Sequence, residues 1–291
     1  MIVTVCLNPV LQKTIVLPAY IEGEVNRSSE HYFYLSGKGV NVSRVLSELG
    51  EKTAHITFSG GMFDMIFRSL AVRERYPIIA VPAKTELRFC YTLLNRKDGS
   101  ATEIVEEGSP VDSTTGTKVL AAFRKELPRA HAVVISGTRA PGFRADIMPT
   151  LVTLAKTAGK TVLIDFRGRD LLASMHCRPD FIKINRYEFS QTFMGGRTAG
   201  LERTMLAVSK DSGARVILTD GKKAIHYTDD GVVKTLSPTR ITAVNPIGSG
   251  DSFAAGFISQ YLRTGSVAQA VRKAEWCARR NAERLMAGTI R

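Results

Sequence analysis

Short runs of apolar and β-branched residues alternate with helical patterns along most of the chain. Runs typical of buried strands occupy Ile2 to Cys6, Ala132 to Ser136, Thr161 to Asp165, Phe181 to Ile184 and Val216 to Thr219. Apolar residues at helical spacing predict helices over Gly39 to Leu49, Arg144 to Ala158 and Leu201 to Ser212. This alternation predicts an α/β fold with a mostly parallel sheet and helices on both of its faces.

Two segments break this pattern, Thr14 to Tyr34 and Arg88 to Val105, because charged residues are interleaved with apolar ones. They predict half-exposed antiparallel strands, with Asp98-Gly99 as the hairpin turn of the second segment. We therefore expect a single α/β domain over residues 1–291, with a small β sheet made from two insertions at about 12–35 and 86–106. A small sheet with one apolar face needs cover, so it could close over a ligand, pair with a second subunit, or do both.

Composition is that of an ordinary globular protein, with 44% hydrophobic and 23% charged residues among 291. The formal net charge of +13 could attract nucleic acid, membranes or small anions. Its densest groups fall on the last predicted helix, and a solvated basic helix face is the explanation that we favour for them. We find neither a nucleic-acid-binding signature nor exposed aromatic platforms, so we expect no nucleic-acid partner.

The cysteines and histidines argue against a metal centre or a disulfide framework. The four cysteines are scattered without a C-x-x-C pair, and the five histidines do not cluster. No apolar run reaches the length of a membrane span, and Met1 to Thr14 has no secretory pattern. We therefore expect a cytoplasmic protein with reduced thiols and no membrane partner.

A glycine-rich segment, Asn245 to Asp251, precedes a clear helical pattern. Gly248 and Gly250, with the small Ser249 between them, let backbone N–H groups point into one concavity and form an anion site at a helix N-terminus. A phosphoryl group in transfer suits such amides, and Asp251 can accept the proton of an attacking hydroxyl. The same residues also make a good helix start with a first-turn acid, and the segment alone leaves both interpretations open.

A second glycine-containing segment begins the helix expected over Gly39 to Leu49. Gly37 permits close backbone approach, Lys38 can meet a phosphate, and Asn41 offers a donor and an acceptor to a sugar hydroxyl. A plain helix entry with incidental polar residues is the alternative. Neither glycine segment matches a Walker loop or the dinucleotide-binding spacing.

A third candidate is acidic. Asn185 and Glu188 are three residues apart and share a face if a helix begins there. Hard oxygen ligands suit Mg²⁺, which keeps most of its waters and needs few protein contacts. Glu188 could instead be a first-turn acid that stabilises the helix dipole.

Together, the two glycine segments resemble the N-terminal and C-terminal signatures of the PfkB or ribokinase-like carbohydrate kinases. The resemblance covers nearly the whole chain, since further matching segments follow in family order: Asn8-Pro9, Thr102 to Ile104, Pro141-Gly142, Lys183 to Glu188 and Thr219 to Gly221. Within the family, the chain is most similar to the branch of 1-phosphofructokinases and tagatose-6-phosphate kinases. The resemblance implies a ribokinase-like three-layer fold, ATP and Mg²⁺ as cofactors, and a β lid that often also clasps a homodimer.

The resemblance also implies roles for the residues that match its motifs. Asp251 would be the catalytic base, and the backbone of Gly248, Ser249 and Gly250 would form the anion hole. The residues along the nucleotide would be Asn185, Glu188, Thr219, Gly221 and Asn281, with Glu188 holding Mg²⁺ through water. The residues facing the sugar or its phosphate would be Gln12, Gly37, Lys38, Asn41, Arg88, Thr138, Arg139 and Arg27.

Some positions depart from the family pattern. Gln12 stands where the family usually carries an aspartate that binds sugar hydroxyls, and an amide both donates and accepts where a carboxylate only accepts. Ser36 replaces a usual glycine, and Arg139 adds a cation near the expected substrate. None of these changes removes the base or the anion hole, so they bear on the substrate rather than on the reaction.

Three functions fit this pattern. The first, which we expect, is an ATP-dependent kinase for a phosphorylated sugar of the fructose 1-phosphate or tagatose 6-phosphate type. The others are a kinase of the same fold for an unphosphorylated sugar or nucleoside, and a non-catalytic ligand-sensing protein on the same scaffold. The first function requires Lys38, Arg27, Arg88 and Arg139 to converge on one side of the pocket.

Overall fold

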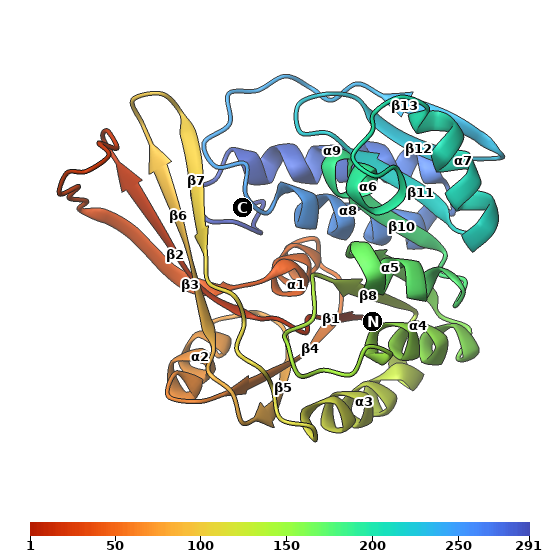
Figure 1. Ribbon diagram of the computed structural model, residues 1–291, viewed down its shortest axis with the longest axis horizontal. Helices are drawn as coiled ribbons and strands as arrows, with labels where there is room; N and C mark the ends of the chain where they lie inside the picture. The colour runs from red at the N-terminus through yellow and green to blue at the C-terminus, as the bar shows by residue number, and fades with distance from the viewer.

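The computed structural model describes residues 1–291 and is built around one large sheet (Figure 1). The sheet has nine strands in the order β13-β12-β11-β10-β9-β8-β1-β4-β5, and all neighbours from β11 to β5 are parallel. The strands are β1 (Ile2–Val5), β4 (Thr53–Gly60), β5 (Ile78–Ala83), β8 (Ala132–Ser136), β9 (Thr161–Asp165), β10 (Phe181–Asn185), β11 (Arg215–Thr219), β12 (Ile225–Asp229) and β13 (Val232–Leu236). The last two form an antiparallel hairpin at one edge.

Helices cover both faces of this sheet. One face carries α1 (Lys38–Glu48), α8 (Ser249–Thr264) and α9 (Val267–Ala282). The other face carries α3 (Thr115–Glu126), α4 (Ile147–Thr157), α5 (Gly168–Met175), α6 (Arg186–Phe193) and α7 (Leu201–Ser212). Because both faces are covered, alternate residues of one strand enter different cores: Val133 belongs to the core that includes α4, and Val134 to the core that includes α8. This explains the continuous apolar runs in the sequence.

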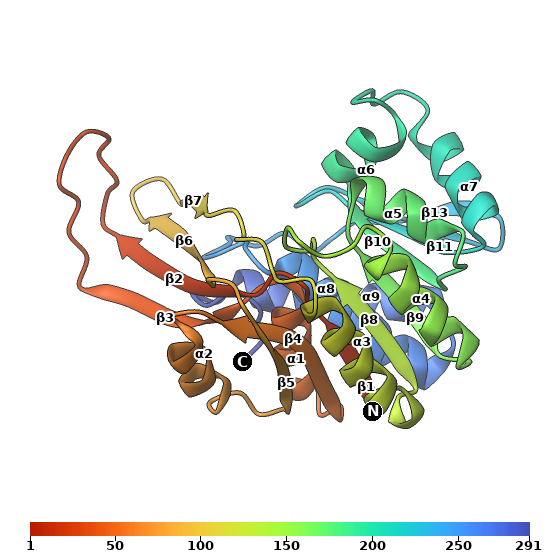
Figure 2. The same cartoon turned by 60° about the horizontal axis from the view of Figure 1, so that its bottom comes forward.

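A second, four-stranded sheet projects from one edge of the body, and we call it the lid (Figure 2). Its order is β3-β2-β6-β7, from β2 (Val10–Leu17), β3 (Glu30–Ser36), β6 (Arg88–Asn95) and β7 (Ser100–Val105). Each hairpin is antiparallel as expected, but β2 and β6 pair in parallel. They do so because both enter the lid from parallel strands, β1 and β5, and leave that sheet in the same direction. The remaining helix, α2 (Asp64–Ala71), lies below the lid.

The expected α/β fold with a small β lid is therefore confirmed, and local turn chemistry explains its hairpins. Gly99 lies between β6 and β7 with a φ of 71°, and Asp230-Gly231 joins β12 to β13 with φ values of 52° and 76°. These left-handed conformations favour Gly, Asn and Asp. No helix combines the length and the apolar character needed to cross a bilayer.

Candidate active site

The candidate site lies where the parallel strands of the large sheet end and helices α1 and α8 begin. A cavity of about 150 Å³ opens there. It is lined by residues that follow β1, β8 and β9, together with side chains from α1, α6 and the lid: Cys6, Asn8, Lys38, Arg88, Gly137, Thr138, Phe166, Arg167 and Glu188. The carboxyl ends of parallel strands are the usual place for a ligand in such sheets, because loops and helix N-termini meet there.

Asp251 lies in the first turn of α8 and is 6% exposed. Its Oδ2 accepts a hydrogen bond from Asn41 Nδ2 at 2.8 Å, which joins the starts of α8 and α1. Burial raises the pKa of Asp251 to about 6; the nearby Asp165 adds to the rise, and Lys38 and Lys183 oppose it. A carboxyl group with this pKa is mostly ionised at pH 7 and can still take up a proton, as a general base must.

The loop before α8 presents two free backbone amides. The N–H groups of Gly248 and Gly250 donate to no protein acceptor, whereas Ser249 N donates to the Pro246 carbonyl at 3.2 Å and Asp251 N to the Gly248 carbonyl at 3.1 Å. Gly248 has a φ of 81°, and a Cβ there would lie 2.5 Å from the amide nitrogen of Gly288. Only glycine fits this position, so the loop shape that exposes the amides depends on it.

Asn281 is fully buried beneath this loop and does not open toward a ligand. Its Nδ2 donates to the Ile247 carbonyl at 2.8 Å and to Ser249 Oγ at 3.2 Å. Its Oδ1 accepts from Gly288 N at 2.7 Å and from Ser252 Oγ at 3.0 Å. Asn281 therefore fixes the loop that precedes α8, which we call the anion loop, to the C-terminal segment. The sequence did not reveal this contact.

Two lysines converge on one fully buried carboxylate beside the loop. Asp165, at the end of β9, accepts from Lys183 Nζ at 3.0 Å and from Lys38 Nζ at 3.3 Å. Burial alone would raise the pKa of Asp165, but the two ammonium groups outweigh it and hold that pKa below its usual value. A Cβ on Gly250 would lie 2.8 Å from Lys183 Nζ, so this ammonium group lies next to the backbone of the anion loop.

Glu188 serves two purposes at once. It forms a capping box with Asn185, in which Asn185 Oδ1 accepts from Glu188 N at 2.8 Å and Glu188 Oε2 accepts from Asn185 N at 3.4 Å. Its other oxygen, Oε1, lies 3.5 Å from Lys38 Nζ, and the residue is part of the cavity lining. The helix-start interpretation of Glu188 and the ligand interpretation are therefore compatible.

Two of the residues expected along the nucleotide lie side by side on neighbouring strands. Asn185 pairs with Thr219 at the carboxyl ends of β10 and β11. Gly221 follows in an exposed turn with a φ of 57°. These positions lie at or just beyond the carboxyl ends of β10 and β11.

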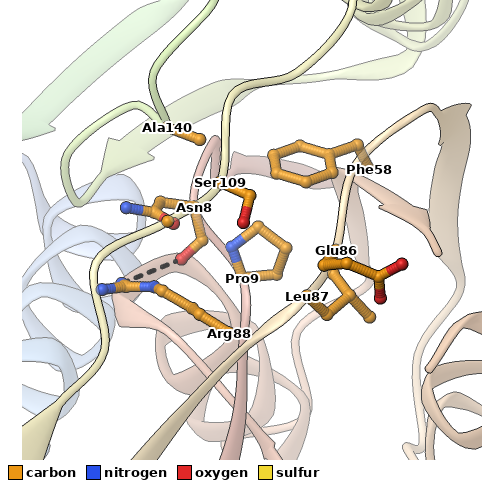
Figure 3. A pocket seen from close by; sticks show the side chains of 9 residues that line it. Asn8, Pro9, Phe58, Glu86, Leu87, Arg88, Ser109 and Ala140 are labelled. Carbon is orange, nitrogen blue, oxygen red and sulfur yellow. Dashed lines mark hydrogen bonds between the residues drawn. The ribbon is translucent and has the colours of Figure 1, made fainter. Parts of the chain in front are cut away.

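The residues expected on the sugar side differ in how they are held. Arg88 Nη2 donates to the Asn8 carbonyl at 3.3 Å (Figure 3). Its Nη1 donates to the Glu106 carbonyl at 3.1 Å. Thr138 Oγ1 accepts from Asn8 Nδ2 at 3.4 Å. Gln12 is buried and donates from Nε2 to Thr92 Oγ1 at 3.0 Å across the lid strands. Gly37, with a φ of 109°, precedes Lys38 at the start of α1.

Only part of the expected basic set lines the cavity. Lys38 and Arg88 do. Arg139 does not: its Nε binds both carboxylate oxygens of Asp170 at 3.1 Å, and its Nη1 binds the Phe143 carbonyl at 2.9 Å. Arg27 lies exposed in the loop between β2 and β3, at the far end of the lid. The four cations therefore do not converge as the phosphosugar interpretation required.

Three charged residues of this region had no role assigned from the sequence: Asp165, Lys183 and Arg167. Lys183 is a lysine inside an otherwise apolar buried strand, and a buried charge of this kind requires a partner. That signal was available, but it did not identify Asp165, which lies on the neighbouring strand. Arg167 carried no such signal, because it follows a strand in an exposed turn.

The family model of the pfkB family carbohydrate kinases matches residues 7–289, so the chain belongs to this family and is an ATP-dependent sugar kinase. A Thermotoga maritima protein described as a possible 1-phosphofructokinase superposes with a TM-score of 0.90 at 22% identity, over 98% of this chain and 93% of that one. Phosphofructokinase-2 from Escherichia coli in complex with fructose-6-phosphate gives 0.85 at 21% identity, over 99% and 95%. The tetrameric inhibited form of that enzyme gives 0.83 at 21% identity, over 95% and 92%. At these identities the structures show a shared fold, and the expected family is confirmed.

Proposed function

We propose that this kinase transfers the γ-phosphoryl group of ATP to a hydroxyl of a phosphorylated sugar, with Asp251 as general base. The hydroxyl oxygen forms a bond to the γ-phosphorus while the bond from that phosphorus to the bridging oxygen breaks, and ADP leaves. The hydroxyl proton passes to Asp251. The free amides of Gly248 and Gly250, with Lys183 beside them, stabilise the charge on the transferred group.

The observation that carries this proposal is the position of Asp251. Its carboxylate is buried, is held by Asn41 and follows directly after the two free amides. A residue that only capped α8 would direct its oxygen to a backbone N–H of its own helix. Asp251 instead directs Oδ2 to a side chain of another helix, so its orientation is set by the site.

The donor set fits Mg²⁺, which would assist by neutralising charge on the ATP phosphates. The carboxylates of Glu188 and Asp165 both pair with the Lys38 ammonium, and of the two only Glu188 also lines the cavity. Both are hard oxygen donors, and neither needs more than a water-mediated contact to an ion of this kind. Glu188 is the residue that would hold the ion, with Asp165 behind it.

The convergence of four cations that we expected for a phosphorylated acceptor is absent. The case for such an acceptor therefore depends on Arg88, the one member of that set that lines the cavity without a carboxylate partner. We would test the proposal by ADP production with Mg-ATP and a panel of fructose 6-phosphate, fructose 1-phosphate, tagatose 6-phosphate and the free sugars. Turnover at least tenfold higher in kcat/KM for a phosphosugar than for its free sugar is the expected result. No turnover with any phosphosugar contradicts it.

A second candidate, a kinase for an unphosphorylated sugar, is favoured by the placement of Arg139 and Arg27. Neither lines the cavity, so fewer cations face the acceptor than the sequence suggested. In the same panel, equal kcat/KM for a free sugar and its phosphate would establish this second function.

The proposal includes a homodimer formed through the lid. Phe33, Phe89 and Tyr91 stack in a row on one lid face, with ring centroids 6.4 Å and 6.1 Å apart. Phe33 is 38% exposed and Ile104 is 53% exposed, which leaves apolar area to cover. Sedimentation velocity should show a dimer that Phe33→Glu dissociates and that Lys97→Glu, at the lid hairpin tip, leaves intact. A monomeric unmodified protein would contradict the dimer.

A further inference from the structure

Arg167 is the least constrained charged residue that lines the cavity. It follows β9 directly, at the start of α5, where its backbone is extended (φ −133°, ψ 173°). Its side chain is exposed and takes part in no hydrogen bond and no ion pair. An arginine held at a cavity wall without a partner retains all five donors for a ligand.

The positive charges of Arg167 and Arg88 are not balanced by any neighbouring carboxylate. Lys38 is paired with Asp165 and Glu188. Arg88 donates only to main-chain carbonyl oxygens, and no carboxylate lies within ion-pair distance of either arginine. The cavity therefore presents two unpaired guanidinium groups, which attract an anion.

The two arginines stand on different walls. Arg167 follows β9, and Arg88 is tied to Asn8 after β1, with β8 between those two strands. Two inter-strand spacings put β9 about 10 Å from β1, the strand after which Arg88 is anchored. Two long side chains across such a gap can bind one phosphate from both sides, and the guanidinium fork matches phosphate oxygens.

We propose that Arg167 is a specificity-determining residue that binds, together with Arg88, the phosphate already present on the acceptor sugar. This inference rests on the proposed function, since it assumes a phosphorylated acceptor. It also accounts for the missing convergence of the basic set: Arg167 supplies the cation that Arg139 does not.

The test compares Arg167→Gln with Arg167→Lys and with Arg169→Gln. Arg169 is an exposed arginine of the same helix that does not line the cavity, so it is a matched control for loss of one charge. We expect Arg167→Gln to raise KM for the phosphosugar about 10- to 100-fold, the range for one lost charge-assisted hydrogen bond, with KM for ATP unchanged. Arg167→Lys should recover part of this loss, because it keeps the charge without the fork. Arg169→Gln should behave as the unmodified enzyme.

Calorimetric titration with inorganic phosphate, without sugar or nucleotide, separates the two proposals. We expect Arg167→Gln to weaken phosphate binding about tenfold and Arg169→Gln to leave it unchanged. If no phosphosugar is turned over but phosphate binding depends on Arg167, the function fails and the subsite stands. If a phosphosugar is turned over and Arg167→Gln matches Arg169→Gln in both assays, the function stands and the subsite is overturned. A rise in KM for ATP alone would also overturn it, because Arg167 would then serve the nucleotide.

Discussion

The helix starts of α1 and α8 both carry two glycines around one polar residue, yet the surroundings of those glycines differ. At α1, a Cβ on Gly39 would lie 2.9 Å from the Val5 carbonyl oxygen and 2.8 Å from Cys6 Cβ. At α8, a Cβ on Gly250 would meet only the end of one side chain, Lys183 Nζ. The first glycine is needed for packing of helix against strand, and the second leaves its amide open.

Because of this difference, the start of α1 contributes side chains to the site, and the start of α8 contributes mainly backbone amides. Close packing of α1 on β1 brings Lys38 to Asp165 and Glu188, and Asn41 to Asp251. The start of α8 supplies free amides and the carboxylate itself. Similar glycine patterns thus lead to two physical roles, which the sequence alone cannot separate.

The largest expected effect comes from Asp251→Asn, which keeps the shape of the α8 start and removes its base. We expect kcat to fall by about 10²-fold or more. We also expect the variant to be more stable at pH 7, by about 2 kcal/mol, because a buried carboxylate with a raised pKa opposes folding when ionised. Steady-state kinetics and chemical denaturation measure both.

Asp211→Asn, on the exposed side of α7, is the control for this prediction, since it should change neither quantity. Full activity in Asp251→Asn would rule out the assigned base. A variant that was inactive and also strongly destabilised would show instead that Asp251 acts as a structural cap.

The next largest effect concerns the ion pairs that α1 joins. Asp165→Asn leaves Lys183 buried without a counter-charge, and we expect a loss of about 3–5 kcal/mol in the free energy of unfolding. Adding Lys183→Met should restore most of that stability, because no unpaired charge remains, while activity stays low. A stable Asp165→Asn single variant, measured by urea denaturation, would show that the cluster contributes little.

Two matched substitutions test the different roles that we assign to Gly39 and Gly250. Gly39→Ala should cost about 1–3 kcal/mol in stability, since the added methyl meets rigid backbone. Gly250→Ala should change stability by less than about 1 kcal/mol, because alanine favours a helix, while kcat falls about tenfold as Lys183 is displaced. Thermal melts and kcat of both variants decide this, and the opposite pattern would reverse the roles assigned to the two helix starts.

The sequence predicted those parts of the molecule that depend on local pattern. Periodicity located α7 at its observed bounds, and turn chemistry located the hairpin at Asp98-Gly99. The glycine loop before α8 was identified because its chemistry lies within a few consecutive residues. The parallel pairing of β2 with β6 was missed, because no local pattern records the direction in which two distant strands leave a sheet.

The sequence also did not predict the ion-pair partners of the charged residues. Arg139 was expected beside the substrate, but its partner Asp170 lies in α5, and their contact exists only because the turn after β8 meets that helix. Asp165 and Lys183 likewise meet because β9 and β10 are neighbours. Charges whose partners come from another element cannot be assigned before the strand order is known.

The smallest expected effect is the pH dependence, and it tests whether Asp251 is held by the site or by its helix. The active form is ionised, so kcat/KM should be level above pH 7 and fall about tenfold per pH unit below pH 6. The folded-state pKa lies above the unfolded one, so the folded protein binds the proton more tightly between about pH 4 and pH 6. This stabilising contribution is present at low pH and is lost as the pH rises through 6. The stability gain of Asp251→Asn should therefore vanish near pH 4 and be complete by pH 7, whereas a carboxylate held by helix amides would give the opposite slope, because its pKa would be lowered.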